Sequence, residues 1–421
     1  SFIEAISNIK LAAAQTNMEL GLLDEKLGNA IVEAATEVAS GNFDDQFVVD
    51  IFQTGSGTST NMNANEVISN RAIEILGGEL GSRNPVHPND HVNTGQSSND
   101  VIPTAIHVAA AKSIKNSLIP SLKQLKTSLT RKSEEFMPVI KTGRTHLQDA
   151  TPVRLGQEFT GHTGQIERGI QRCEQALVEL SEVALGGTAV GTGVNTHAEF
   201  AKKVCAKISH SLEIDIHETN NHFQAQSTLD NIVQASGAMK TIAVSLMKIA
   251  NDVRWMGSGP RGGFGEIELP EVQPGSSIMP GKVNPVIPES VCQVAAQVIG
   301  NDTSVAIAGQ SGNFEINVMM PVAAYNLLQS IDILSTASSN FASQCIDGLK
   351  STSKGPEMVE RGLAIGTTLV PHIGYDASAD IAHKAQEAGK TVLEIALSET
   401  DFSEDQLRKI LDPEGMTEPT I

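Results

Sequence analysis

The sequence predicts a mainly all-α protein, and two observations support that prediction. Aromatic residues make up only 4% of the 421-residue chain, so its core must be built from Ala, Val, Ile and Leu, as in helical bundles. In addition, long segments repeat apolar residues at three- and four-residue spacing, which is the period of one face of a helix. There are five of these segments: 100–136, 153–184, 228–256, 285–311 and 320–350.

The helical elements can be predicted in chain order. Residues 1–40 show the same spacing, broken by Gly21 and Gly28, and predict two or more helices. The third long segment has the clearest pattern, because its apolar residues recur in steps of three, four and seven: Leu229, Ile232, Met239, Ile242, Leu246, Ile249 and Val253. At about 1.5 Å rise per residue, each long helix would span on the order of 40 Å.

These patterns divide the chain into three predicted domains. Residues 1–96 form a mostly helical N-terminal domain, residues 97–352 a central bundle of five long helices, and residues 353–421 a small helical C-terminal domain. The long helices carry more small and apolar residues than one buried face needs, as Ala295, Ala296, Ala323 and Ala324 illustrate. We therefore expect subunits to associate through them.

Composition limits the partners and the compartment. A formal net charge of −19 repels nucleic acid and anionic membranes, so neither is an expected partner. No apolar run approaches the length of a membrane span, and no secretory leader is expected. The cysteines form no C-x-x-C pair, which indicates reduced thiols in a cytoplasmic protein. They are Cys173, Cys205, Cys292 and Cys345.

Two polar loops each stand just before a predicted helix. Residues 53–63 are rich in Gly, Ser, Thr and Asn, and Ser97, Ser98 and Asn99 precede the first long helical segment. Such residues serve as ordinary helix caps. Unpaired backbone N–H groups at a helix start also favour a bound anion. Both interpretations stay open from the residue types alone.

A third polar loop, residues 275–285, is bounded by prolines and contains two glycines. It also holds two hydroxyls, an ammonium and a carboxamide, from Ser276, Ser277, Lys282 and Asn284. This density of hydrogen-bonding groups suits the capture of a small anion on a mobile loop. A plain Gly/Pro-rich surface connection is the alternative.

Histidines suggest acid–base chemistry at one place and no metal at another. His146 lies in a predicted loop among Arg144, Thr145 and Gln148, where it is either a structural residue or an acid or base. His87 and His91 are four residues apart, but Pro88 favours a loop over the helix that a metal pair would need. We predict no metal site.

The Gly-rich residues 186–195 lack a βαβ context, so no nucleotide cofactor is expected.

Taken together, the loops suit a small dicarboxylate substrate. Removing a proton α to a carboxylate builds a second negative charge on that group, so the transition state needs preorganised hydrogen-bond donors. A hydroxyl leaving from the next carbon needs a proton from an acid tuned near neutral pH. Loops at the ends of separate long helices can converge only if helices of different chains lie side by side.

Three separated motifs resemble the class II fumarases of the fumarase/aspartase superfamily, and the resemblance extends over nearly the whole chain. They are Thr54–Thr58 with Asn61–Asn63, Ser97–Asp100, and the loop around Ser276. Aspartases usually carry Gln where His146 stands, so residues 143–149 resemble fumarase, as do residues 371–375. Residues 284–289 look more like aspartase, which is kept as an alternative, together with a catalytically silent structural relative.

The resemblance implies a fold and an activity. The family subunit has three mostly helical domains, and its central five-helix domains form a twenty-helix core in a homotetramer. Each active site takes loops from three subunits. The implied reaction is the reversible hydration of fumarate to (S)-malate, a step of the tricarboxylic acid cycle, without a metal or cofactor.

The resemblance also implies a role for each site residue. Ser276 is the implied base for the C3 proton of malate, with its alkoxide held by loop amides and Lys282. His146, paired with Glu289, is the implied activator of the water that leaves or adds. The implied substrate ligands are Ser56, Thr58, Ser97, Ser98, Asn99, Thr145, Lys282 and Asn284. A second dicarboxylate site is implied near His87, Asn89 and Asp90.

Overall fold

The structure is a computed structural model that describes residues 1–419. The chain forms two compact units, which interleave along the sequence. Unit 1 contains residues 1–122, 168–244 and 293–337, and unit 2 contains residues 123–167, 245–292 and 338–421. The division into three domains at residues 96 and 352 stays a prediction.

All five long helical segments predicted from apolar spacing are helical in the structure. The first consists of α4 (Ser98–Ser113), a π-helical turn η3 (Ile114–Leu118) and α5 (Ile119–Phe136). The others are α6 (Leu155–Ser181), α9 (Asp230–Met256), α10 (Val286–Gly309) and α11 (Met320–Gln344). The mainly all-α fold class is therefore confirmed, and α5, α6, α9, α10 and α11 have residues in both units.

Burial along α9 supports the predicted periodicity residue by residue. All seven apolar residues that defined the pattern are at most 1% exposed: Leu229, Ile232, Met239, Ile242, Leu246, Ile249 and Val253. A continuous apolar face of this kind supplies most of a helix's stability through packing rather than through intrinsic propensity.

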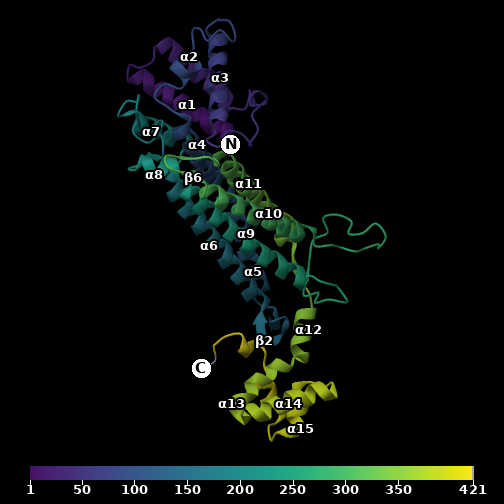
Figure 1. The fold of residues 1–421 in the computed structure, drawn as a ribbon. Helices are drawn as coiled ribbons and strands as arrows, with labels where there is room; N and C mark the ends of the chain where they lie inside the picture. The colour runs from purple at the N-terminus through teal and green to yellow at the C-terminus, as the bar shows by residue number, and fades with distance from the viewer. Residues whose placement is uncertain (420–421) are drawn as a thin grey trace. The chain divides into compact units, whose positions relative to one another are not determined.

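The N-terminal helices of unit 1 share one hydrophobic cluster. α1 (Phe2–Glu19), α2 (Glu25–Ala39) and α3 (Thr58–Ile75) pack against one another around Ile31, Ala34 and Ile68 (Figure 1). The remaining elements of unit 1 are η1 (Asp44–Gln46), η2 (Pro88–Val92), β3 (Glu182–Val183), α7 (Phe200–Leu212), β4 (His217–Glu218), α8 (His222–Ser227), β6 (Gly312–Asn313) and β7 (Ile316–Asn317).

Unit 2 contains a hairpin where the sequence predicted a loop. β1 (Ile140–Thr145) pairs antiparallel with β2 (Gln148–Arg154), and only His146 and Leu147 connect them. Both connecting residues have positive φ, 56° and 60°. A two-residue turn of this type matches the twist of the flanking strands. The sequence lacks the Asn-Gly or Asp-Gly pair that usually signals such a turn, which explains the difference.

The C-terminal helices of unit 2 form their own cluster around Leu369, Val392 and Leu407 (Figure 1). They are η5 (Leu363–Leu369), α13 (Val370–Ile373), α14 (Tyr375–Ala388), α15 (Val392–Glu399), α16 (Glu404–Ile410) and η6 (Glu414–Met416). The preceding helix α12 (Lys354–Arg361) packs against β1 instead. The short elements β5 (Ile267–Glu268), η4 (Ile346–Gly348) and β8 (Lys350–Ser351) precede them.

Among the helices of residues 1–419, none combines the length and the apolar character needed to cross a membrane.

The buried His107 of unit 1 should make the fold less stable in acid. The imidazole of His107 on α4 contacts the carbonyl of Glu182 through Nδ1 at 2.9 Å. Burial lowers its pKa to about 4. In the unfolded chain this imidazole is protonated near pH 6.5, whereas in the folded chain it stays neutral down to about pH 4. The unfolding free energy is therefore unaffected by this group above pH 6.5 and falls as the pH is lowered from 6.5 to about 4.

We expect this histidine to account for roughly 3 kcal/mol of the unfolding free energy lost between those pH values. Urea unfolding of the wild type and of His107→Gln at pH 7 and pH 4.5 measures this loss of unfolding free energy. The neutral variant should lose less stability on acidification. An equal loss in both proteins would assign the acid effect to other groups.

Candidate active site

The structure brings three of the predicted hydroxyl ligands together in unit 1. Ser56 Oγ lies 2.8 Å from Thr58 Oγ1, and Thr58 Oγ1 lies 2.8 Å from Ser98 Oγ. Thr58 is the first residue of α3 and Ser98 the first residue of α4, so the starts of two helices meet here. Free N–H groups and the positive ends of both helix dipoles favour an anion at this place.

The start of α4 is fixed by a complete capping box. Ser97 caps the helix by accepting from the N–H of Asn99, and Asp100 accepts from the N–H of Ser97 at 2.9 Å. The buried carboxylate of Asp100 also accepts from the N–H groups of Gly186 and Thr188, each at 3.0 Å. The Gly-rich connection at 186–195 thus supports the start of α4 that carries Ser98.

The start of α3 is fixed by a glycine and a side-chain clasp. Gly57 has φ +72°, and a Cβ there would lie 2.8 Å from the side chain of Ile102. Gln53 accepts from the N–H of Thr60 at 3.1 Å and donates to its hydroxyl at 2.8 Å. These contacts hold the turn that carries Ser56.

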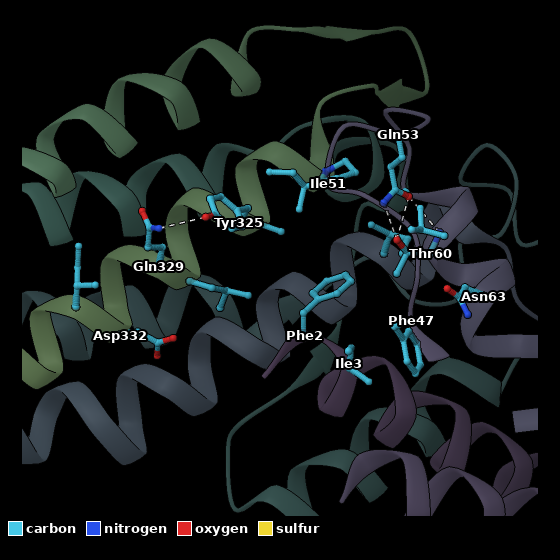
Figure 2. A pocket seen from close by; sticks show the side chains of 17 residues that line it. Phe2, Ile3, Phe47, Ile51, Gln53, Thr60, Asn63, Tyr325, Gln329 and Asp332 are labelled. Atoms are coloured by element: carbon cyan, nitrogen blue, oxygen red, sulfur yellow. Dashed lines mark hydrogen bonds between the residues drawn. The ribbon is translucent and has the colours of Figure 1, made fainter. Parts of the chain in front are cut away.

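The cavity behind this turn does not suit a dicarboxylate. It has a volume of about 500 Å³ and is lined by Phe2, Ile3 and Phe47 together with residues of α11 (Figure 2). Of the residues that line it in the described chain, only Asp332 is charged, and its charge has the wrong sign for an anion. The helix starts, and not this cavity, are therefore the candidate substrate site in unit 1.

In unit 2, the hairpin places His146 at an exposed tip beside Thr145. The strand β1 of this hairpin is held by buried ion pairs, because Glu266 lies 2.8 Å from Arg144 and 3.2 Å from Lys141. The guanidinium of Arg144 also stacks over the ring of Phe264, 4.2 Å from its centroid. A rigid hairpin base can hold an exposed imidazole in a defined position.

In the predicted anion-binding loop of unit 2, residues 275–285, two backbone N–H groups donate to Ser276. Ser276 Oγ accepts from the N–H of Met279 at 3.0 Å and from that of Ile278 at 3.2 Å. Asn284 closes the loop by donating to the carbonyl of Gly275 at 2.7 Å. A side chain at Gly275 would collide with the carbonyl oxygen of Lys282, 2.0 Å from an added Cβ, so this approach requires glycine.

The remaining predicted residues of unit 2 are not joined within one chain. Glu289 lies in the first turn of α10, and Lys282 is exposed. In residues 1–419, no hydrogen bond or ion pair connects His146 with Glu289, or Ser276 with Lys282. The His146–Glu289 pair stays a prediction that one chain by itself does not fulfil.

The residues of the implied second site share one short turn in unit 1. His87 Nδ1 accepts from the N–H groups of Asn89 and Asp90, each at 3.2 Å, and lies 3.4 Å from an Asp90 carboxylate oxygen. His91 Nδ1 accepts from the N–H of His87 at 2.8 Å. Each of these two nitrogens is occupied by the backbone. In the described residues, no group of three or more His, Cys, Asp and Glu side chains could hold a metal ion.

Sequence reasoning missed the residues that hold these parts in place. Lys10 and Asn93 are hydrogen-bonded to each other, and Asn93 also contacts α3, while Glu266 is paired with Arg144 of the hairpin. A lysine within an apolar helical stretch, as at Lys10, is the one sequence signal that could have indicated a buried polar contact.

Comparison with known proteins first defines the class. The model of a lyase family matches residues 3–300, which is more than half of the chain. A second model, described as the fumarase C C-terminus, matches residues 365–418. These matches agree with a helical fold whose polar sites lie at helix starts and loops.

Individual relatives then define the family. The chain is 54% identical over 417 residues to a class II fumarate hydratase of Halobacterium salinarum, covering 99% of this chain and 88% of that protein. It is 49% identical over 420 residues to fumarate hydratase class II 2 of Bradyrhizobium diazoefficiens, covering 100% and 89%. The crystal structure of class II fumarase from Schistosoma mansoni has a TM-score of 0.95 at 39% identity, covering 99% and 90%. The chain belongs to the class II fumarate hydratase family.

Proposed function

We propose that this protein catalyses the reversible hydration of fumarate to (S)-malate. The observation that carries the proposal is the meeting of Ser56, Thr58 and Ser98 hydroxyls at the starts of two helices. Such a site binds a carboxylate through oriented donors and helix dipoles. Relatives named fumarate hydratase, about half identical over nearly the whole chain, support the same reaction.

Ser276 is the proposed base for the C3 proton of malate. Its oxygen accepts two backbone N–H bonds, and the same donors would stabilise an alkoxide more than a neutral hydroxyl. Proton removal places a second negative charge on the adjacent carboxylate. Preorganised donors must meet that charge. The proposed ligands of the substrate carboxylates and hydroxyl are Ser56, Thr58, Ser97, Ser98, Asn99, Thr145, Lys282 and Asn284.

His146 is the proposed group that protonates the leaving hydroxyl and, in reverse, activates the water that adds. An imidazole changes charge near neutral pH, as a proton carrier between water and substrate requires. Glu289 would orient the imidazole and stabilise its protonated form. Because one chain does not join these two residues, their contact belongs to the assembled protein.

We extend the proposal to a homotetramer whose active sites combine loops of three subunits. Large apolar side chains are exposed along four of the long helices, and an apolar helix face of this kind marks an association surface. They are Val178, Val244, Trp255, Ile307 and Tyr325. Their burial between subunits would give the predicted twenty-helix core, and sedimentation tests the tetramer.

Two further expectations belong to the proposal. The turn that holds His87, Asn89 and Asp90 would bind a second dicarboxylate, supported by the exposed Arg83 nearby. A cytoplasmic location is supported by four cysteines without disulfide partners in the structure.

The test of the reaction is an absorbance assay of fumarate in ammonia-free buffer. We expect fumarate to be consumed and malate to form, and malate to yield fumarate in reverse. Product formation that requires ammonium and yields aspartate would contradict the proposal and assign the protein to the ammonia lyases. The matched comparison is the same enzyme sample with and without ammonium chloride at constant ionic strength.

A further inference from the structure

Lys10 is a fully buried lysine on α1, with 0% of its surface exposed. Its ammonium donates to Asn93 Oδ1 at 2.8 Å and to Gln96 Oε1 at 2.9 Å. Within residues 1–419 no carboxylate lies within ion-pair distance of it. The nearest acidic influence is the buried Asp100.

Burying a charged group without an ion-pair partner is costly, whereas Leu or Met would fill the same space at no such cost. Desolvation lowers the pKa of Lys10 to about 7, and Asp100 opposes this in part. Stability therefore does not explain a lysine at this position. Its two hydrogen-bond partners indicate what it does.

The first partner, Asn93, connects Lys10 to the start of α3. Asn93 Oδ1 also accepts from the side-chain amides of Asn65 at 3.2 Å and Asn61 at 3.3 Å. Asn61 lies three residues after Thr58 and so belongs to the first turn of α3. One oxygen thus receives donors from α1 and from α3.

The second partner, Gln96, connects Lys10 to the start of α4. Gln96 directly precedes Ser97, the residue that caps α4. The amide of Asn93 donates to the carbonyl of Gln96 at 3.1 Å, so the two partners of Lys10 are themselves joined. The ammonium of Lys10 therefore holds the segment that leads into α4, and Asn93 links that segment to the first turn of α3.

We propose that Lys10 is a positioning residue for substrate binding, which holds the starts of α3 and α4 in register so that Thr58 and Ser98 engage one carboxylate together. The inference rests on the proposed function of that cluster. Lys10 itself touches no substrate group, and it acts only through Asn93 and Gln96.

The geometry sets a narrow tolerance for this role. Thr58 Oγ1 and Ser98 Oγ are 2.8 Å apart, and a carboxylate that bridges them requires both at hydrogen-bond distance. A relative shift of about 1 Å between two helix starts is enough to lose oriented contacts. Because these ligands bind substrate and transition state alike, their loss should raise KM more than it lowers kcat.

The test compares Lys10→Met with Lys132→Met in the assembled full-length protein. Lys132 on α5 is nearly as buried, donates to the carbonyl of Leu349 at 2.8 Å, and belongs to unit 2. We expect Lys10→Met to raise KM for fumarate and Ki for the unreactive dicarboxylate succinate about tenfold, with kcat within about twofold of wild type. Lys132→Met should lower thermal stability without changing either constant.

A second variant separates positioning from stability. In Lys10→Met/Gln96→Leu, the Gln96 oxygen that lost its donor is removed as well, so much of the stability loss should be recovered. KM should nevertheless stay raised. If Lys10→Met does not fold, Gln96→Leu alone provides the test, because it cuts the same tie from the other side and should raise KM and Ki.

Unchanged KM and Ki in a folded Lys10→Met or Gln96→Leu enzyme would overturn the proposal and leave Lys10 a structural residue. Recovery of KM together with stability in the double variant would overturn it too. An inactive wild type would instead refute the proposed function, and succinate titration by calorimetry would then still compare wild type with variant at this site.

Discussion

Replacing Ser276 with alanine should lower kcat for malate dehydration by about a thousandfold or more. The serine oxygen accepts N–H bonds from Ile278 and Met279, which prepare it to carry negative charge. Alanine removes the proton acceptor and leaves the loop backbone unchanged. The hydroxyl contributes little to binding, so KM should change far less than kcat.

The measurement should follow proton transfer as well as turnover. When malate is incubated with the enzyme in deuterated water, incorporation of deuterium at C3 reports removal of the C3 proton even when the hydroxyl does not leave. Ser276→Ala should lose both exchange and net reaction, whereas Ser277→Ala, which alters the exposed neighbouring hydroxyl, should lose much less. Persistent exchange in Ser276→Ala would place the base on another residue.

The spacing of apolar residues was sufficient to predict the long helices, because it reflects which face of each helix is buried. The seven apolar residues that defined the pattern along α9 recur with the helical period, and all seven are buried. A hairpin between the first long helices was missed, since His146 and Leu147 take positive φ without glycine or asparagine. There, contacts of the hairpin base with Glu266 outweigh the intrinsic preference of the turn residues.

The candidate site was predictable only in part. The polar loops were visible in the sequence, and their similarity to family motifs predicted the substrate ligands, which stay a prediction. Thr58 and Ser98 lie forty residues apart, and no spacing rule predicts that their hydroxyls meet. The contacts of Lys10 on α1 with Asn93 and Gln96 likewise form only once distant segments have packed together.

This arrangement explains how an acidic protein can bind a dianion. A net charge of −19 repels fumarate at long range. Beyond roughly 10 Å, salt screens that repulsion, and the local field is what the substrate meets. The two helix starts supply positive potential at short range. Attraction is therefore built into the site and not into the surface.

Mixing two inactive variants should restore activity, if the sites are shared between subunits as proposed. His146→Asn should lower kcat at least a hundredfold, because the amide cannot carry the proton of the leaving hydroxyl. When Ser276→Ala and His146→Asn chains are co-expressed under different tags and purified through both, some sites will receive an intact Ser276 loop from one chain and an intact hairpin from another.

Random assembly of equal amounts predicts about a quarter of wild-type activity in these hybrids. The matched control mixes Ser276→Ala with Lys282→Met, two changes on the same loop, so that every site receives a defective loop and activity stays low. Sedimentation must show assembled hybrids in both mixtures. Hybrids of Ser276→Ala and His146→Asn that stay inactive would mean that one chain supplies both residues to a site, and the shared-site proposal would fail.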